Sequence, residues 1–138
     1  MAFSLYCLIN ENSDSFSLEF FEKELRKCFS KTEGLSLNYE KDPFDPSNKH
    51  LLLSWEGWWI KFFYETGQHV IDDSLEIATH AKTSLASEIS SIDKRVIVRF
   101  ADDELKVYTN HIILMMDYLE DIPNIIIFNP KTNTFIES

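Results

Sequence analysis

The segment from His50 to Gly67, HLLLSWEGWWIKFFYETG, predicts a β-hairpin. Apolar and polar side chains alternate up to Trp55, and Glu56-Gly57 is a pair suited to a tight reversal. We therefore expect strands over about 50–55 and 58–65. Because successive side chains of a strand point to opposite faces, the second strand has a uniformly apolar face and a mixed face. The apolar face consists of Trp58, Ile60, Phe62 and Tyr64, and the mixed, partly buried face of Trp59, Lys61, Phe63 and Glu65.

The first half of the chain adds a strand and a helix. The apolar run Phe3–Ile9 predicts a buried strand. Ser15 or Ser17 is suited to cap a helix that ends before Gly34. The apolar stripe expected for this helix consists of Phe16, Phe20, Leu25, Cys28 and Phe29. Two prolines and little apolar periodicity predict that residues 38–49 form the longest loop.

The second half predicts two more helices, a strand and a closing hairpin. Asp73 is expected to cap a helix with the stripe Ala78, Ala81, Leu85 and Ile89, and residues 95–100 to form a strand. Thr109 is expected to cap a helix that runs to about Glu120, with the stripe Ile112, Met116 and Leu119. Residues 125–128 and 134–136 complete the hairpin. The order predicts one α+β domain over residues 1–138, with about three helices covering a largely antiparallel mixed sheet of about five to six strands.

The chain is strongly acidic, with 23 Asp and Glu against 13 Lys and Arg and a formal charge of −10. Such a charge disfavours nucleic acid and favours a basic protein partner. A hydrophobic content of 44% is too high for a disordered acidic tail. The chain shows neither a signal-peptide pattern nor an apolar run of about 20 residues, so we expect a cytoplasmic protein without membrane contact. Cys7 and Cys28 are expected to be buried, reduced thiols.

Patterns that specify chemistry are weak. His69, Asp72, Asp73 and His80 are the densest group of metal donors, but their spacing matches no zinc motif. The run Asp102-Asp103-Glu104 lacks the ligand spacing of a calcium loop and is typical of a solvated loop or a helix start. Only three glycines, Gly34, Gly57 and Gly67, are present, which excludes a G-x-S-x-G elbow and phosphate-binding loops. We therefore expect no catalytic residue, no metal and no cofactor.

A partner surface is the stronger expectation. Of residues 101–138, seven are acidic and two basic, and the Thr109–Glu120 helix presents a negative edge. Nucleic-acid stacking on the tryptophans is disfavoured, because Lys61 is the one basic residue nearby in sequence. Trp59 and Phe63 are either interface anchors or sheet residues beneath a helix. The residues proposed to bind a partner are Asp102, Asp103, Glu104, Asp117, Glu120, Asp121, Trp59 and Phe63.

These features together resemble bacterial immunity proteins, the small acidic antidotes to toxins of type VI or contact-dependent secretion systems. The resemblance is carried by size, acidity, the hairpin LLLSWEGWWIKFFYE and the ending YTNHIILMMDYLEDIPNIIIFNPKTNTFI. It implies a protein that is not an enzyme and that neutralises a cognate toxin stoichiometrically. In that mechanism an acidic surface docks on the toxin's basic active-site region and aromatic anchors slow its release.

Two other functions remain open at this point. One is a small acidic enzyme or ligand-binding domain with a pocket near the 38–49 loop, in which His50 or His69 works with a carboxylate as acid and base. The other is a subunit of a homo-oligomer, which would show a self-complementary apolar patch.

Overall fold

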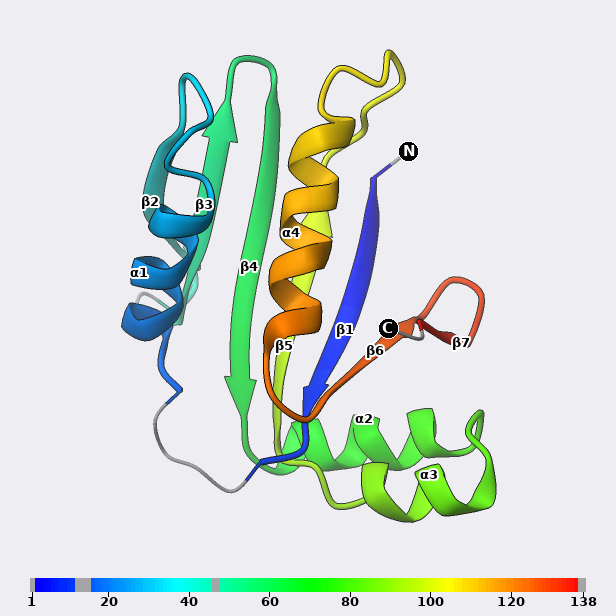
Figure 1. The fold of residues 1–138 in the computed structure, drawn as a ribbon. Helices are drawn as coiled ribbons and strands as arrows, with labels where there is room; N and C mark the ends of the chain where they lie inside the picture. The colour runs from blue at the N-terminus through cyan, green and yellow to red at the C-terminus, as the bar shows by residue number, and fades with distance from the viewer. Residues whose placement is uncertain (1, 12–15, 46–47, 137–138) are drawn as a thin grey trace.

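One antiparallel sheet organises the protein, with the strand order β2-β3-β4-β5-β1-β6-β7. The computed structural model describes residues 2–11, 16–45 and 48–136. Within these residues the strands are β1 (Phe3–Ile9), β2 (Ser36–Lys41), β3 (Lys49–Trp55), β4 (Trp58–Thr66), β5 (Lys94–Phe100), β6 (Ile125–Asn129) and β7 (Thr134–Ile136). The helices are α1 (Leu18–Cys28), α2 (Gln68–Ala78), α3 (Thr83–Ile89) and α4 (Thr109–Asp121) (Figure 1). The predicted α+β class is confirmed.

The centre of the fold is a β-α-β-β-α-β unit made of β1, α1, β4, β5, α4 and β6. The hairpin β2–β3 extends one edge of the sheet, and α2 and α3 are inserted between β4 and β5. Both α1 and α4 lie on the same face of the sheet, whereas α2 and α3 lie across its lower end (Figure 1). The sheet therefore has a face covered by α1 and α4, called here the covered face, and an opposite face.

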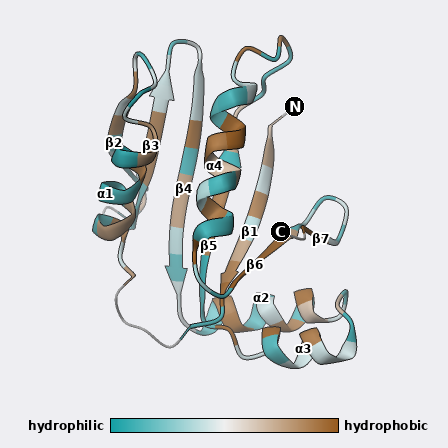
Figure 2. Cartoon of the chain, viewed as in Figure 1, coloured by the Kyte–Doolittle hydropathy of each residue, from teal (hydrophilic) through white to brown (hydrophobic). Residues whose placement is uncertain are grey.

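The main core lies between the covered face and the helices α1 and α4. Phe21 and Leu25 from α1 and Met115 and Leu119 from α4 are buried there. They pack with the inward side chains of the strands, which include Leu53, Ile60, Phe62 and Val98. Figure 2 shows that α4 carries hydrophilic residues between its apolar ones, as expected for a helix that packs on one side only.

A smaller cluster on the opposite face is covered by α2 and α3. Ile77 and Ile89 from these helices and Ile92 pack with Leu8 and Phe128 from the sheet. Leu8 belongs to this cluster, whereas its neighbours Cys7 and Ile9 enter the main core, because side chains alternate along β1. This second cluster occupies only part of the opposite face.

The predicted hairpin and the first helix cap are confirmed. β3 and β4 are joined through Glu56 and Gly57, and Gly57 has a φ of +75°, which favours glycine. The Ser17 hydroxyl accepts a hydrogen bond from the backbone N–H of Phe20 at 3.1 Å and caps α1. Ser15, the alternative cap, lies outside the described residues. Phe21, which the expected stripe omitted, is fully buried.

The prediction of a long loop over residues 38–49 is wrong, because the first part of this segment belongs to the edge strand β2. Leu37 pairs with Leu53 and Tyr39 with Leu51. An edge strand that faces solvent on one side needs few apolar residues, so the alternation in SLNYEK is short and weak. The backbone bond from Asp42 N–H to the Asn48 carbonyl, 2.9 Å long, closes the remaining turn.

The boundaries of two predicted helices also need correction. In place of the one helix predicted to begin at Asp73, the structure has two helices, α2 and α3. Because α2 begins directly after Gly67, Asp73 lies inside this helix and does not cap it. Thr109 is the first residue of α4, and Tyr108 occupies the cap position. On α4 the buried residues are Met115 and Leu119, with the expected residues Ile112 and Met116 only partly buried.

Candidate protein-docking surfaces

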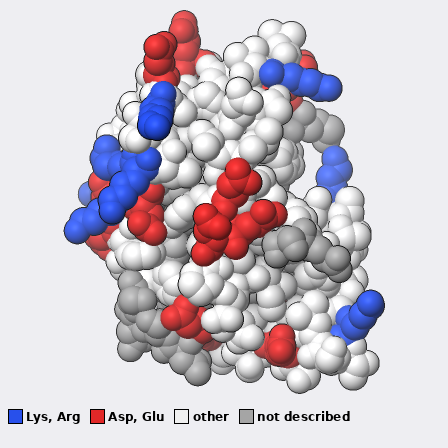
Figure 3. All heavy atoms as spheres, in the orientation of Figure 1, with Lys and Arg blue, Asp and Glu red and all other residues white. Residues whose placement is uncertain are grey.

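Acidic side chains gather on the solvent side of α4. Asp117, Glu120 and Asp121 occupy its last turns and are exposed. Figure 3 shows an acidic patch over the lower part of α4 without Lys or Arg inside it, while basic side chains gather over the α1 side. Asp102 and Glu104 lie at the other end of the helix, which spans about 20 Å for its 13 residues. The predicted acidic residues thus bracket α4 instead of forming one cluster.

Exposed aliphatic side chains lie between these acids, and the sequence interpretation missed them. Leu105 is 87% exposed, Val107 66% and Ile113 50%. Ile113 lies one helical turn before Asp117 on the same side of α4. Its position outside the predicted apolar stripe could have indicated that it is exposed. A group of exposed aliphatic side chains rimmed by polar residues is a candidate protein-binding surface. The α4 surface is defined here as Asp102, Glu104, Leu105, Val107, Ile113, Asp117, Glu120 and Asp121.

A groove between α1 and α4 adjoins this surface. Its cavity of about 200 Å³ is lined by Phe20 and Glu24 from α1 and by Tyr118 and Asp121 from α4, among others. The Tyr118 hydroxyl is buried and has no hydrogen-bond partner among the described residues. Burial, followed by the nearby carboxylate of Glu24, raises the pKa of this phenol above its ordinary value. Glu24 thus adds an acid from a second helix, which sequence spacing on α4 alone does not reveal.

Asp103 has a structural role at the start of α4. Its carboxylate accepts hydrogen bonds from the backbone N–H groups of Val107 and Tyr108, both at 3.0 Å. These bonds satisfy the N–H of Tyr108 at the cap position of α4 and the N–H of Val107 in the loop before it. Asp103 is half-buried, whereas Asp102 and Glu104 are exposed. Asp103 therefore holds the loop to the start of α4 through its side chain.

Trp59 and Phe63 lie on the opposite face of the sheet from α4. They alternate with Trp58, Ile60 and Phe62, which enter the main core beneath the helices. The Lys61 ammonium lies 5.0 Å from the centre of the Trp59 ring. The Phe63 ring stacks on the His50 imidazole with 4.2 Å between ring centres. The structure does not bring these aromatic residues together with the acids of α4, so the two groups belong to two separate surfaces.

A hollow of about 680 Å³ lies beside the β2–β3 hairpin, where the alternative interpretation placed a pocket. His50 Nε2 is 2.7 Å from Glu40 Oε1 at its wall. The same Glu40 oxygen is 3.1 Å from Lys61 Nζ. Burial raises the pKa of Glu40, but the hydrogen bonds from Lys61 and His50 outweigh it and hold the pKa below its ordinary value. His69 does not line this hollow, but its Nε2 lies 3.8 Å from Oε1 of Glu65, which does.

The candidate metal donors on α2 and just after it contact different partners. The Asp73 carboxylate lies 2.7 Å from Arg95 Nη1, and the His80 ring stacks against Phe128. Asp72 accepts a hydrogen bond from Gln68 at 3.0 Å. In the described part of the chain, no three His, Cys, Asp or Glu side chains are grouped so as to hold a metal ion.

The longest helix within the described residues has 13 residues, and none of these helices is long and apolar enough to cross a membrane. Comparison with models of protein families, with curated proteins and with solved structures finds no match to this chain.

Proposed function

We propose that the protein is an antidote that binds a cognate bacterial toxin and neutralises it by covering the toxin's active-site region. It acts stoichiometrically and without catalysis. The observation that carries this proposal is the α4 surface, where exposed Leu105, Val107 and Ile113 lie among exposed carboxylates. A surface with both features suits a partner that is basic at its rim and apolar at its centre.

The two kinds of side chain have different roles in this mechanism. The carboxylates of Asp117, Glu120 and Asp121 raise the rate of encounter with a basic toxin and disfavour other partners. The aliphatic side chains lose contact with water on docking, so they slow dissociation. The groove that Glu24 and Tyr118 line lies beside this surface and suits a basic side chain of the toxin. The negative charge of this surface also disfavours binding to nucleic acid.

Co-expression with the product of the gene immediately upstream tests the proposal. We expect a one-to-one complex that co-purifies at low salt and associates more slowly at high salt. The variant D117K/D121K should bind at least about tenfold more weakly. The variant E76K/E88K makes the same charge change on exposed residues of α2 and α3 and should bind like the wild type. Absence of a complex at both salt concentrations would refute the proposal.

The hollow beside the β2–β3 hairpin supports a second candidate function, binding of a small ligand. The observation that favours it is the 2.7 Å contact between His50 and Glu40 at the wall of a hollow of about 680 Å³. A histidine beside a carboxylate is an arrangement that acid–base chemistry uses. Screening a metabolite library by thermal shift with the wild type and with H50Q tests it. A ligand whose stabilisation disappears in H50Q would support this function, and no shift with any compound would exclude it.

A further inference from the structure

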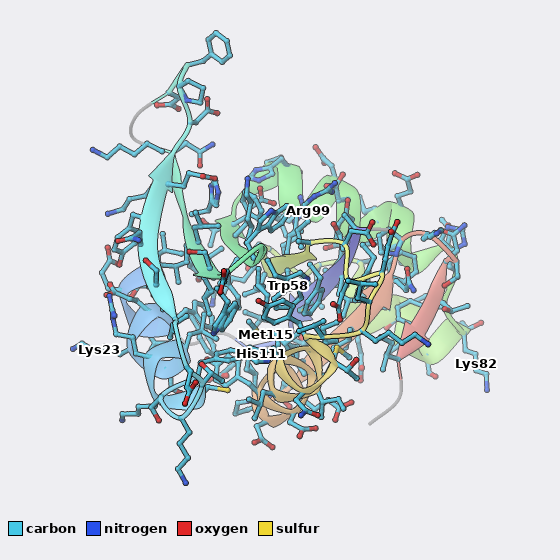
Figure 4. The ribbon with its side chains drawn as sticks, turned by 90° about the horizontal axis from the view of Figure 1, so that it is seen from above. Lys23, Trp58, Lys82, Arg99, His111 and Met115 are labelled. Carbon is cyan, nitrogen blue, oxygen red and sulfur yellow. The ribbon has the colours of Figure 1, made fainter. Side chains whose placement is uncertain are left out.

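The opposite face of the sheet carries a surface that the proposed toxin contact does not use. Strand pairing places Leu52 beside Lys61, Lys61 beside Arg99, and Phe63 beside Ile97. Residues paired in this way share a face, and Trp59 is on the same face two positions before Lys61. These six residues are called here the open face. In Figure 4, Arg99 lies on the side of the sheet away from α4, whereas Trp58, His111 and Met115 lie toward α4.

Among the described residues, three apolar side chains of the open face lack a covering helix, whereas Trp59 packs partly against the main core. Leu52, Phe63 and Ile97 are half-buried, and none of them packs against either of the two core clusters of the described residues. The helices α2 and α3 cover Leu8 and Phe128 farther along the same face, and within the described residues their cluster does not include these three. The Phe63 ring is stacked on one side by the His50 imidazole. Three partly exposed apolar side chains on adjacent strands form a patch. A patch of this kind indicates a binding surface, whereas single exposed apolar residues do not.

The charge of the open face is opposite to that of the molecule. Arg99 is exposed, donates a 3.4 Å hydrogen bond to the Ser4 hydroxyl and has no ion pair with a carboxylate among the described residues. Lys61 lies beside it and is shared between Glu40 at 3.1 Å and the Trp59 ring. The open face therefore centres on Arg99 and on Lys61, whose charge is partly balanced by Glu40, in a chain whose formal charge is −10.

We propose that the open face docks a partner protein through a segment that carries carboxylates beside apolar side chains. Arg99 and Lys61 bind the carboxylates, and the apolar groups cover Trp59, Phe63 and Ile97. Arginine and tryptophan are the residues that most often dominate protein interfaces. This inference goes beyond the proposed function, because it concerns the other side of the sheet and a partner of the opposite charge.

A nucleic acid fits the open face less well than an acidic protein segment. Stacking on Trp59 and Phe63 would suit bases, but a bound strand needs a continuous basic path for its phosphates. Glu40 and Glu65 border the open face and would repel such a strand. A protein segment has fewer charges and can place them opposite Arg99 and Lys61 alone.

Selection from a displayed library of random dodecapeptides on the intact protein tests the proposal. We expect the enriched peptides to combine Asp or Glu with apolar residues and to bind R99E at least about tenfold more weakly than the wild type. The control K23E makes the same charge change on an exposed residue of α1 and should bind like the wild type (Figure 4). Peptides that are basic, peptides that bind R99E unchanged, or no enrichment at all would overturn the proposal.

Two further measurements separate other occupants. Fluorescence anisotropy with a single-stranded oligonucleotide would overturn the proposal if the oligonucleotide bound the wild type and not R99E. Sedimentation that showed a dimer lost in R99E would overturn it in favour of a second copy of the chain. D117K/D121K should leave peptide binding intact, and R99E should leave the toxin complex intact, so this inference and the proposed function fail independently.

Discussion

The Arg95 guanidinium lies 2.7 Å from the Asp73 carboxylate, and this contact joins the central strand β5 to α2. Arg95 Nη2 is also 2.7 Å from Glu65 Oε1 on β4, and the guanidinium lies 5.3 Å from the centre of the Tyr6 ring. The Arg95 side chain is only 6% exposed, whereas Asp73 is 48% exposed. Burial lowers the pKa of Arg95, but the hydrogen bonds to Asp73 and Glu65 outweigh it and raise that pKa.

Replacing Arg95 with Ala should lower the free energy of unfolding by about 2 kcal/mol. The loss is smaller than for a fully buried pair, because water can reach Asp73 and Glu65 once the guanidinium is gone. The control K49A removes an exposed 3.6 Å contact with Glu19 and should cost less than about 1 kcal/mol. Urea denaturation of both variants measures the difference, and equal losses would contradict this account.

His111 should make the protein less stable at acid pH. It lies among the rings of Phe29, Trp55, Trp58 and Tyr108, and its Nδ1 is buried without a partner among the described residues. Burial lowers the pKa of His111 below its ordinary value of 6.5, and Asp103 opposes this shift. The unfolded chain therefore binds the proton more tightly, so stability is full above pH 6.5 and is lost as the pH falls toward the folded-state pKa.

The variant H111F should remove this part of the pH dependence because it keeps an aromatic ring in the same place. The control H69F alters a histidine whose side chain is 60% exposed and should keep the wild-type profile. Free energies of unfolding measured across a pH series give the comparison. If the H111F and wild-type profiles have the same slope below pH 6.5, His111 is not the group responsible.

Asp103 should contribute more to stability than its acidic neighbour. D103A removes the two 3.0 Å hydrogen bonds to the N–H groups of Val107 and Tyr108 and should cost about 1 kcal/mol. E104A changes an exposed residue and should alter stability by less than about 0.5 kcal/mol. Thermal unfolding of the two variants measures the difference. A larger loss in E104A would show that the loop is held in another way.

The exposed aliphatic residues of the α4 surface should control how long the proposed toxin complex lasts. L105A/I113A should weaken binding by about 1–3 kcal/mol, mainly by raising the dissociation rate. The control L75A truncates a leucine on α2 that is 52% exposed and should leave both rate constants unchanged. Surface plasmon resonance separates the two rates. If the variant changed only the association rate, these side chains would act in the encounter with the toxin and would not slow its dissociation.

The two cysteines should differ in reactivity. Cys7 is fully buried, and burial raises the pKa of its thiol, so it should react only after unfolding. Cys28 is half-buried, and its thiol pKa is raised first by burial and then by Asp117 and Asp121. D117N/D121N should therefore speed labelling of Cys28 by roughly two- to fivefold. Labelling kinetics with C28S as the blank test this, and an unchanged rate would exclude an electrostatic effect on Cys28.

Local patterns in the sequence determined most of the secondary structure. Alternation through Trp55 and Trp58, with Gly57 between the strands, was sufficient to place β3 and β4, because a hairpin depends on neighbouring residues. The strand β2 escaped prediction because it lies at the sheet edge and buries only Leu37 fully. The start of α2 was missed because Gly67 precedes it without a side chain to cap the helix.

Only the tertiary structure decided which functional residues act together. The sequence places Trp59 and Phe63 near other aromatic residues and the acids near the C-terminus, but it does not tell which side of the sheet each group occupies. That depends on strand order and on which face α4 covers, and both arise from contacts between residues far apart in the chain. The same non-local pairing brings Arg99 beside Lys61, so an acidic chain acquires a pair of neighbouring cations beside aromatic side chains.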